Sequence, residues 1–373
     1  MSGCRAIGLM SGTSLDGVDI ALVDTDGERL SALGPTGYRP YTQAQRALLR
    51  DALAAATTLS DRNGRPGVLA EAERLVTEAH AETVAAFLTE HGLAAADIGV
   101  IGFHGQTVLH RPAQRLTVQI GDGRALAARL AIPVAYDFRA ADVAAGGEGA
   151  PLVAIFHQAL ATMIDRPSPL VVVNIGGIAN VTYLADGAPP LACDTGPGNA
   201  LIDDFLHAHG GPPFDAGGMI AAQGQVNEAF VARVLAQPFF AARPPKSLDR
   251  NDFALASIAL PELTLADGAA TLAALTARAI AGITPHLPRT PACWIVAGGG
   301  ARNRTILRML AAAVAPARVE TADALGWSAD ALEAQAFAYL AVRTLRGLPI
   351  TFPTTTGVAR PMTGGIVARP DKR

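Results

Sequence analysis

Lysine is scarce in this sequence. Only Lys246 and Lys372 are lysines among the 30 Lys and Arg residues, and neither follows a glycine-rich loop. A Walker A loop needs a Gly-Lys-Ser/Thr segment and a protein kinase needs a lysine on its third strand, so both of these nucleotide sites are excluded. The dinucleotide fingerprint G-x-G-x-x-G is also missing. If this protein binds phosphate groups, it must use backbone amides, hydroxyl groups and metal ions.

Cysteine, net charge and long apolar runs are limited too. The three cysteines, at positions 4, 193 and 293, are far apart and show no metal-ligand spacing, which is typical of a reducing compartment. The formal net charge of −3, with both signs mixed along the chain, gives no field that would attract nucleic acid or an anionic membrane. No apolar run approaches the roughly 20 residues of a membrane span, and the first residues lack the apolar core of a signal peptide. We therefore expect a cytoplasmic protein that binds neither nucleic acid nor membrane.

The length of 373 residues is more than twice that of a typical domain of about 150 residues, so two domains are expected. Each half opens with a short strand, a glycine-rich turn and a returning strand, first over residues 6–24 and again over residues 170–184. This repeat predicts two related α/β domains. We place the first at residues 1–135 together with about 351–373, and the second at residues 136–350.

Two other segments predict local structure. Residues 137–151 contain three glycines among small side chains, which indicates an ordered loop or a hinge. Residues 328–330 are Ser-Ala-Asp, whose polar side chains commonly cap helices, so they predict the start of a long helix over residues 331–345.

A turn of small and polar residues joins the first two strands. Such a turn presents consecutive N–H groups to an anion and lets a phosphate approach closely. Asp16 or Asp19 could supply one of the carboxylates that Mg²⁺ takes beside water and phosphate, with Asp16 as the tentative ligand. An ordinary hairpin turn is the alternative, because Ser, Gly and Asp are common in turns. The predicted phosphate-binding turn consists of Gly12, Thr13, Ser14, Leu15, Asp16, Gly17, Val18 and Asp19.

Three further glycine turns lie in the second half. Gly176-Gly177 follows a buried strand, and Thr195-Gly196-Pro197-Gly198 precedes a helix whose dipole favours an anion. Asp194 stands directly before the latter turn, where a carboxylate can reach a cleft, although a lone Asp here could also be a cap or turn residue. Gly298-Gly299-Gly300 again joins a strand to a helix, with Asn303 in its first turn, and taken alone it could be a tight loop.

The combination of these features is more specific than any single turn. Their order is that of the actin-like, hexokinase-like ATPase superfamily, whose members clamp ATP between two domains without a Walker lysine. Within that superfamily, the chain resembles the anhydro-N-acetylmuramic acid kinases. The resemblance rests on residues 8–17 (GLMSGTSLDG), 104–107 (HGQT), 119–122 (QIGD), 137–147 (DFRAADVAAGG), 174–180 (NIGGIAN), 194–199 (DTGPGN) and 298–303 (GGGARN).

The resemblance implies both a fold and an activity. The fold is a two-domain α/β, actin-like or hexokinase-like (ribonuclease H-like) ATPase with ATP in an interdomain cleft. The activity converts 1,6-anhydro-N-acetylmuramic acid, ATP and water into N-acetylmuramic acid 6-phosphate and ADP, during peptidoglycan recycling and amino-sugar catabolism. ATP, Mg²⁺, a small amino-sugar substrate and a homodimeric assembly are implied with it.

The resemblance also implies residue roles. Asp194 would take a proton from the water that attacks C1, which frees O6 to attack the γ-phosphate in line. Glu333 matches a family glutamate that contacts the sugar, and Arg139 is a candidate for the lactyl carboxylate by charge complementarity. His104 lies near the cleft by its motif, although a structural role at its strand end is the favoured alternative. The implied nucleotide contacts are Gly12 to Asp19 for the β- and γ-phosphates, Gly176, Gly177, Thr195, Gly196 and Gly198 for the phosphate tail, and Gly298, Gly299, Gly300 and Asn303 for adenosine.

One segment departs from the family pattern. The family usually continues Pro-Lys-Ser with Thr-Gly-Arg-Glu, whereas Pro245-Lys246-Ser247 is followed here by Leu248-Asp249-Arg250. We expect this change to alter the conformation of the loop without touching the chemistry.

Two alternative functions remain open. One is a sugar kinase of the same superfamily that phosphorylates another hydroxyl without hydrolysis. The other is an ATP-binding regulator without catalysis. An intact Asp194 argues against the regulator, because a regulator does not need a base.

Overall fold

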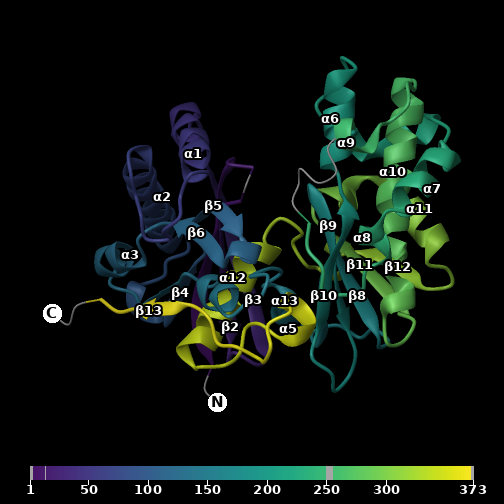
Figure 1. Cartoon of the computed structure of the whole chain (residues 1–373). Coiled ribbons are helices and arrows are strands. Elements are labelled where there is room, and N and C mark those ends of the chain that lie inside the picture. Colours follow the sequence, from purple (N-terminus) through teal and green to yellow (C-terminus); the bar gives the residue numbers. More distant parts are fainter. Residues whose placement is uncertain (1–2, 13, 249–254, 371–373) are drawn as a thin grey trace. The chain divides into compact units, whose positions relative to one another are not determined.

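The computed structural model describes residues 3–12, 14–248 and 255–370, and Figure 1 shows its helices and strands. The chain forms two compact units. Unit 1 contains Met1–Met163 and Ala331–Arg373, and unit 2 contains Ile164–Asp330. None of the helices in these described ranges combines the length and apolarity that crossing a membrane would require.

The units divide after residues 163 and 330, whereas the expected boundaries lie after residues 135 and 350. Packing explains the difference. Helix α12 (Leu332–Leu345) packs against strands β1, β2 and β4 of the first sheet, and helix α5 (Ala154–Ala161) packs against α12. Both helices therefore belong to unit 1.

Unit 1 is built on a six-stranded sheet. β1 and β2 form an antiparallel hairpin with Met10 opposite Asp19, while β4 and then β7 add in parallel to β1. β3 pairs with β2, and the C-terminal β13 pairs antiparallel with β7. The order is β13-β7-β4-β1-β2-β3. The bounds are β1 (Cys4–Met10), β2 (Gly17–Thr25), β3 (Leu30–Pro40), β4 (Val100–Phe103), β7 (Val134–Tyr136) and β13 (Ile366–Ala368).

Alternating side chains of β1 face opposite sides of this sheet. Ile7 and Leu9 are fully buried in a core that also contains residues of α1 and α2. Gly8 points to the other face, where α12 lies. A Cβ atom at Gly8 would be 1.8 Å from the carbonyl oxygen of Ala334, and one at Gly102 would be 2.0 Å from that of Phe337. Glycine at both positions is therefore what allows α12 to approach the sheet so closely.

The remaining elements of unit 1 surround the sheet (Figure 1). The segment predicted as a loop or hinge contains a short helix, α4, so the prediction was incomplete there. A hairpin of β5 and β6 inserts after β4. The bounds are α1 (Gln43–Ala56), α2 (Val68–Glu90), α3 (Gly123–Leu130), α4 (Ala140–Ala144), α13 (Pro353–Thr356), β5 (Gln106–Arg111) and β6 (Leu116–Ile120).

The predicted cap of the long C-terminal helix is wrong. α12 starts after Ala331, which makes no side-chain capping hydrogen bond. Asp330 instead forms an ion pair with Arg302, with Nη2 and Oδ2 2.6 Å apart. The Asp330 carboxylate thus pairs with a side chain of unit 2 and does not cap α12.

Unit 2 repeats the strand order of unit 1. Its sheet has the order β10-β9-β8-β11-β12, with antiparallel pairs on the β10 side of β8 and parallel pairs on the other side. This matches β3-β2-β1-β4-β7 strand by strand, so the prediction of two related α/β domains from the repeated strand–turn–strand pattern is confirmed. The strands are β8 (Leu170–Ile175), β9 (Ile178–Leu184), β10 (Leu191–Pro197), β11 (Cys293–Ala297) and β12 (Arg318–Thr321).

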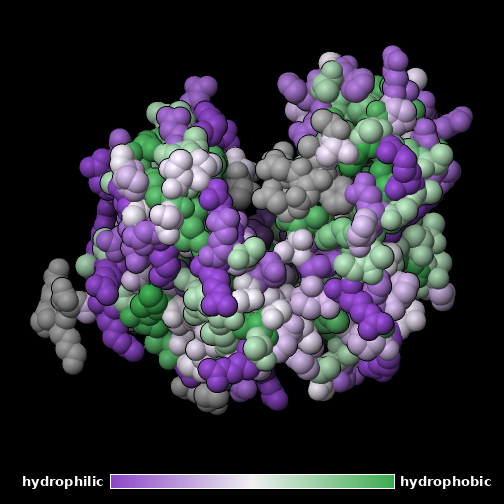
Figure 2. All heavy atoms as spheres, in the orientation of Figure 1, coloured by the Kyte–Doolittle hydropathy of each residue, from purple (hydrophilic) through white to green (hydrophobic). Residues whose placement is uncertain are grey.

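Helix α10 forms the centre of the helical layer of unit 2. Twelve of its 17 residues are buried, and it packs against α6, α7, α11 and β10. On the face that Figure 2 shows, hydrophilic and hydrophobic residues are mixed over the surface of each unit. The helices are α6 (Ala200–Ala208), α7 (Glu228–Leu235), α8 (Pro238–Ala241), α9 (Leu255–Ile258), α10 (Leu265–Ala281) and α11 (Arg304–Ala313).

Candidate active site

Main-chain contacts shape the turn between β1 and β2. The carbonyl oxygen of Gly12 accepts hydrogen bonds from the backbone N of Leu15 at 3.2 Å and from Nε2 of Gln106 at 3.1 Å. Leu15 has a φ of +56° and a buried side chain, and Val18 is fully buried. These two residues can therefore offer a ligand only their backbone groups. Thr13 lies outside the described residues.

Asp16 is the partly exposed carboxylate of this turn. Its Oδ1 accepts a hydrogen bond from Oγ of Ser14 at 2.8 Å, and Asp19 is also partly exposed on β2. Gly17 is required by packing, because a Cβ there would lie 2.4 Å from the carbonyl oxygen of Arg39. Within the described ranges, no group of three or more His, Cys, Asp and Glu side chains is placed to hold a metal. One or two carboxylates are nevertheless what Mg²⁺ usually takes beside phosphate oxygens and water.

Two glycine turns of unit 2 interlock. The backbone N of Gly198 donates to the carbonyl of Gly177 at 2.9 Å, and that of Asn199 donates to the carbonyl of Gly176 at 2.7 Å. A Cβ at Gly198 would be 2.2 Å from the Gly176 oxygen, so the two turns touch only because this residue is glycine. The structure thus brings the predicted phosphate-tail residues together, at the start of α6.

Asp194 and Thr195 lie at a β-bulge of β10. The pairing with β9 shifts between Asp194 and Gly196, which leaves Thr195 as the extra residue. The Thr195 side chain turns inward and donates to the carbonyl of Ala179 at 3.0 Å. Its hydroxyl is therefore committed to the core, and only its backbone remains for a phosphate.

The loop that departs from the family pattern holds Asp194. The backbone N of Leu248 donates to Oδ2 of Asp194 at 2.8 Å, and the backbone N of Asp194 donates to the carbonyl of Lys246 at 2.9 Å. The loop thus contacts the proposed base, contrary to the expectation that it does not touch the proposed chemistry. Lys246 anchors the loop, since its Nζ donates to the carbonyl of Phe239 at 2.8 Å and lies 4.4 Å from the centre of the Phe239 ring. Asp249 and Arg250 lie outside the described residues.

The third glycine turn borders a pocket of about 350 Å³ in unit 2. Gly299 and Asn303 line it, whereas Gly298 and Gly300 pack on the end of β8, where a Cβ would be 2.3 Å from side-chain atoms of Asn174 and Ile175 respectively. Asn303 caps α11 through its Oδ1, which accepts from the backbone N atoms of Thr305 and Ile306. The pocket has apolar and polar walls. Its other lining residues are Asn199, Ile202, Asp203, Pro213, Phe214, Asp215, Gly217 and Arg302.

The three predicted sugar-binding residues form a cluster in unit 1. Nε and Nη2 of Arg139 both lie 3.2 Å from Nε2 of His104. Arg139 also interacts electrostatically with Glu333, at the first turn of α12. The Glu333 side chain is exposed, yet surrounding protein atoms raise the pKa of its carboxyl, and Arg139 acts in the opposite direction.

His104 acts as a neutral hydrogen-bond partner in this cluster. Its Nδ1 lies 2.7 Å from the carbonyl oxygen of Gly105 and must donate to it, so Nε2 is the acceptor for Arg139. Burial lowers the pKa of His104 well below its usual value, and the positive charge of Arg139 lowers it further. His104 therefore orients Arg139 and stays neutral near neutral pH, with its single ring proton on Nδ1, which agrees with the structural alternative for this residue.

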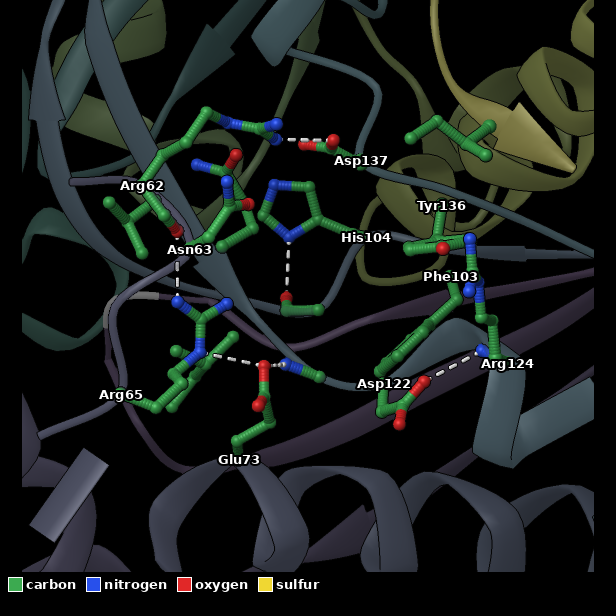
Figure 3. Close-up of a pocket in the computed structure, with 16 residues that line it drawn as sticks. Arg62, Asn63, Arg65, Glu73, Phe103, His104, Asp122, Arg124, Tyr136 and Asp137 are labelled. Carbon is green, nitrogen blue, oxygen red and sulfur yellow. Dashed lines mark hydrogen bonds and ion pairs between the residues drawn. The ribbon is translucent and has the colours of Figure 1, made fainter. Parts of the chain in front are cut away.

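His104 also lies on the wall of a second pocket, of about 300 Å³, but Arg139 and Glu333 do not line it. Figure 3 shows this pocket at the ends of β4 and β7. Arg62 forms an ion pair with Asp137, and Nε of Arg65 lies 2.8 Å from Oε1 of Glu73. These pairs neutralise two of the three arginines that line the pocket, which argues against a phosphate site there.

Three contributors to these sites had no predicted role. Gln106 supports the first turn, Lys246 anchors the loop at Asp194, and Asp142 lies behind Arg139. Gln106 and Asp142 are in segments quoted for the family resemblance, and Lys246 is one of only two lysines. Those signals mark the residues but not their contacts, which join segments far apart in the sequence.

The fold and the turns define a class of protein. Two sheets of the same strand order, each with a glycine turn after its first strand, make the ribonuclease H-like fold of the actin-like, hexokinase-like ATPases. Among solved structures, an activator of the 2-hydroxyisocaproyl-CoA dehydratase from Clostridium difficile with bound ADPNP is similar over 92% of this chain and 97% of that chain, at a TM-score of 0.43 and 14% identity. A ROK family glucokinase from Streptomyces griseus in complex with glucose and AMPPNP is similar over 90% and 99%, at a TM-score of 0.37 and 14% identity.

The sequence comparisons narrow this class to one family. The family model of anhydro-N-acetylmuramic acid kinase matches residues 4–369. Proteins named anhydro-N-acetylmuramic acid kinase are similar over 98% of this chain. That of Rhodopseudomonas palustris (strain BisB18) is 66% identical over 365 residues and covered completely, and that of Nitrobacter winogradskyi is 63% identical over 366 residues and 99% covered. The chain belongs to the anhydro-N-acetylmuramic acid kinase family.

Proposed function

We propose that this protein hydrolyses the anhydro bridge of 1,6-anhydro-N-acetylmuramic acid and phosphorylates O6 with ATP, to give N-acetylmuramic acid 6-phosphate and ADP. Family membership supports the substrate. The observation that carries the chemistry is the position of Asp194, on a bulge directly before the interlocked glycine turns and held by the Leu248 N–H. A cytoplasmic homodimer that serves peptidoglycan recycling and amino-sugar catabolism is part of the same proposal.

The nucleotide site is assigned to the four glycine-containing turns. Backbone N–H groups of the turn from Gly12 to Asp19, other than that of Leu15, would bind the β- and γ-phosphates. The turns of Gly176-Gly177 and Thr195 to Gly198 would bind the rest of the tail. The pocket at Gly299 and Asn303 has the apolar and polar walls that an adenosine needs. Asp16 is the proposed Mg²⁺ ligand, directly or through water. Mg²⁺ would supply positive charge to the phosphate oxygens.

Asp194 acts as the base of the proposed reaction. Its carboxylate accepts the proton of the water that attacks C1, and the bond from C1 to O6 breaks. O6 leaves with the electron pair of that bond and attacks the γ-phosphorus in line, which releases ADP. The Leu248 N–H on Oδ2 fixes the direction of the carboxylate during proton transfer.

Arg139 and Glu333 hold the sugar in this proposal. Arg139 has five N–H groups, and three of them are used by bonds to His104 and to the carbonyl of Gly149. The other two are available for the lactyl carboxylate, while the exposed Glu333 can accept hydrogen bonds from sugar hydroxyl or amide groups.

Glu333→Ala is expected to raise the KM for the anhydro sugar by about 30-fold while changing the KM for ATP by less than about 2-fold, because a charged hydrogen-bonding partner of the sugar is lost. Steady-state kinetics with each substrate varied in turn measures this. Glu90→Ala, an exposed glutamate at the end of α2, is the control and should match the unchanged protein. Equal weakening of both substrates would contradict the placement of Glu333.

The reaction type is tested with oxygen-18 water. Hydrolysis at C1 should place the label on the C1 hydroxyl of the product and leave O6 unlabelled, as read by mass spectrometry of fragments. Unlabelled N-acetylmuramic acid 6-phosphate, kept in the same water, corrects for exchange at the anomeric carbon. A phosphorylated product that retains the anhydro bridge would show a kinase without hydrolysis, and no sugar-dependent ADP release would support the regulator.

A further inference from the structure

A buried carboxylate, Asp142, lies behind the sugar-binding cluster and has no part in the proposed chemistry. It is in α4 and only 2% exposed. Its Oδ1 accepts the backbone N–H of Gly149 at 2.7 Å, and its Oδ2 accepts the hydroxyl of Thr356 at 2.7 Å. Both oxygens therefore tie the loop after α4 to α13, more than 200 residues further along the chain.

The backbone of Gly149 connects this carboxylate to Arg139. Its N–H donates to Asp142, and its carbonyl accepts Nη1 of Arg139 at 2.8 Å. Gly149 has a φ of +67°, and a Cβ there would lie 2.5 Å from the side chain of Val143. These features restrict the residue at this position to glycine, and the backbone N of Glu148 ties the same loop to α13 by donating to the carbonyl of Thr356 at 2.7 Å.

The guanidinium of Arg139 is consequently held on two sides. Gly149 holds Nη1, and His104 holds Nε and Nη2. His104 is fixed in turn by Gly105. If the backbone of Gly149 moves, His104 is the hydrogen-bond partner that remains for the guanidinium within the described part of the chain.

We propose that Asp142 is a positioning residue for sugar binding: together with Thr356 it fixes the backbone of Gly149, and through that backbone it holds Arg139 in place for the carboxylate-bearing sugar. The identity of the ligand rests on the proposed function. The hydrogen bonds of Asp142, Gly149 and Arg139 are made within the chain itself and do not depend on that identity. A purely structural role, in which Asp142 only joins the loop to α13, is the competing explanation.

Kinetics of three variants separate the two roles. Asp142→Ala removes both hydrogen bonds and should raise the KM for the sugar by about 10- to 100-fold, since a small misplacement of a binding group has effects of this size. Thr356→Val removes the hydrogen bond to Asp142 at nearly constant side-chain volume and should raise the KM for the sugar by about 3- to 10-fold. Thr355→Val is the matched control, because Thr355 is similarly buried and its hydroxyl bonds to Phe352, the residue directly before α13. The KM for ATP should stay within about 2-fold in all three.

A second measurement does not depend on activity. Arg139 holds down the pKa of Glu333, so displacement of Arg139 in Asp142→Ala or Thr356→Val should raise that pKa in the ligand-free protein. Carbon-13 NMR of labelled glutamate carboxyls, assigned with Glu333→Gln, measures it. Loss of the negative charge of Asp142 would by itself lower the pKa of Glu333. A rise of the Glu333 pKa in Asp142→Ala therefore reports movement of Arg139.

Each outcome is decisive. An unchanged Glu333 titration in folded variants overturns the positioning role, as does equal weakening of both substrates. If Asp142→Ala does not fold, Thr356→Val carries the test, because it removes the bond from Thr356 that fixes the Asp142 carboxylate while the buried carboxylate keeps its bond to Gly149. If the unchanged protein does not phosphorylate the sugar, the proposed function fails, while the Glu333 titration still decides whether Asp142 positions Arg139.

Discussion

Asp194→Asn is expected to lower kcat by about 1,000- to 10,000-fold while ATP binding changes by less than about 2-fold. The amide cannot take a proton from water, but its oxygen can still accept the N–H of Leu248, so the loop and the bulge should keep their conformation. Sugar-dependent ADP release measures kcat, and isothermal titration calorimetry measures ATP binding.

Asp186→Asn is the control for this experiment. Asp186 is an exposed aspartate in the turn after β9 of the same unit, and it lies in none of the site segments, so the substitution should leave kcat unchanged. Near-normal turnover by Asp194→Asn would remove Asp194 from the mechanism. A parallel loss of ATP binding would show that Asp194 serves the glycine turns and not the water.

Gly8→Ala is expected to destabilise the protein by about 3 kcal/mol or more, so that little folded protein accumulates. The added methyl group would lie 1.8 Å from the carbonyl oxygen of Ala334 and 2.4 Å from the backbone N of Ala338. Both are backbone atoms of α12, so the whole helix must move away from the sheet. Urea unfolding followed by circular dichroism gives the free energy of unfolding.

Gly3→Ala is the matched control near the same end of the chain. A Cβ at Gly3 would meet no atom within 4 Å. The free energy of unfolding of the Gly3→Ala protein should therefore stay within about 0.5 kcal/mol of that of the unchanged protein. A stable, fully folded Gly8→Ala protein would contradict the close packing of α12 on β1.

The secondary structure of the repeated units could be predicted well because their signals are local. The alternation of Val18, Ile20 and Leu22 marks β2, and the small residues before it mark the turn. The same pattern around Gly176-Gly177 marks β8 and β9. The cap of α12 failed for the opposite reason. Ser328 and Asp330 are residue types that commonly cap helices, but Asp330 forms an ion pair with Arg302, which is 28 residues away.

The candidate site divides in the same way. Asp194, Gly198 and Glu333 could be predicted as candidates because glycine turns and motif residues are visible in sequence order. The contacts that hold the residues in and behind the candidate site could not be predicted from the sequence. The Leu248 N–H that bonds to Asp194 lies 54 residues away, and the Thr356 hydroxyl that bonds to Asp142 lies 214 residues away. The pattern of the departing loop predicted no contact with Asp194, because the bond is made by a backbone group that any residue carries.

The sequence by itself determined that phosphate must be bound without a Walker lysine, that two related α/β units carry the glycine turns, and which residues are the candidates for base and sugar contacts. These conclusions depend on residue type and local period, which the chain shows directly. Only the tertiary structure decided that α12 belongs to unit 1, that His104 is a neutral partner of Arg139, and that Lys246 and Asp142 bond to the loops at Asp194 and Gly149. Those facts depend on close approach between distant segments, where a missing Cβ or one buried hydrogen bond decides the arrangement.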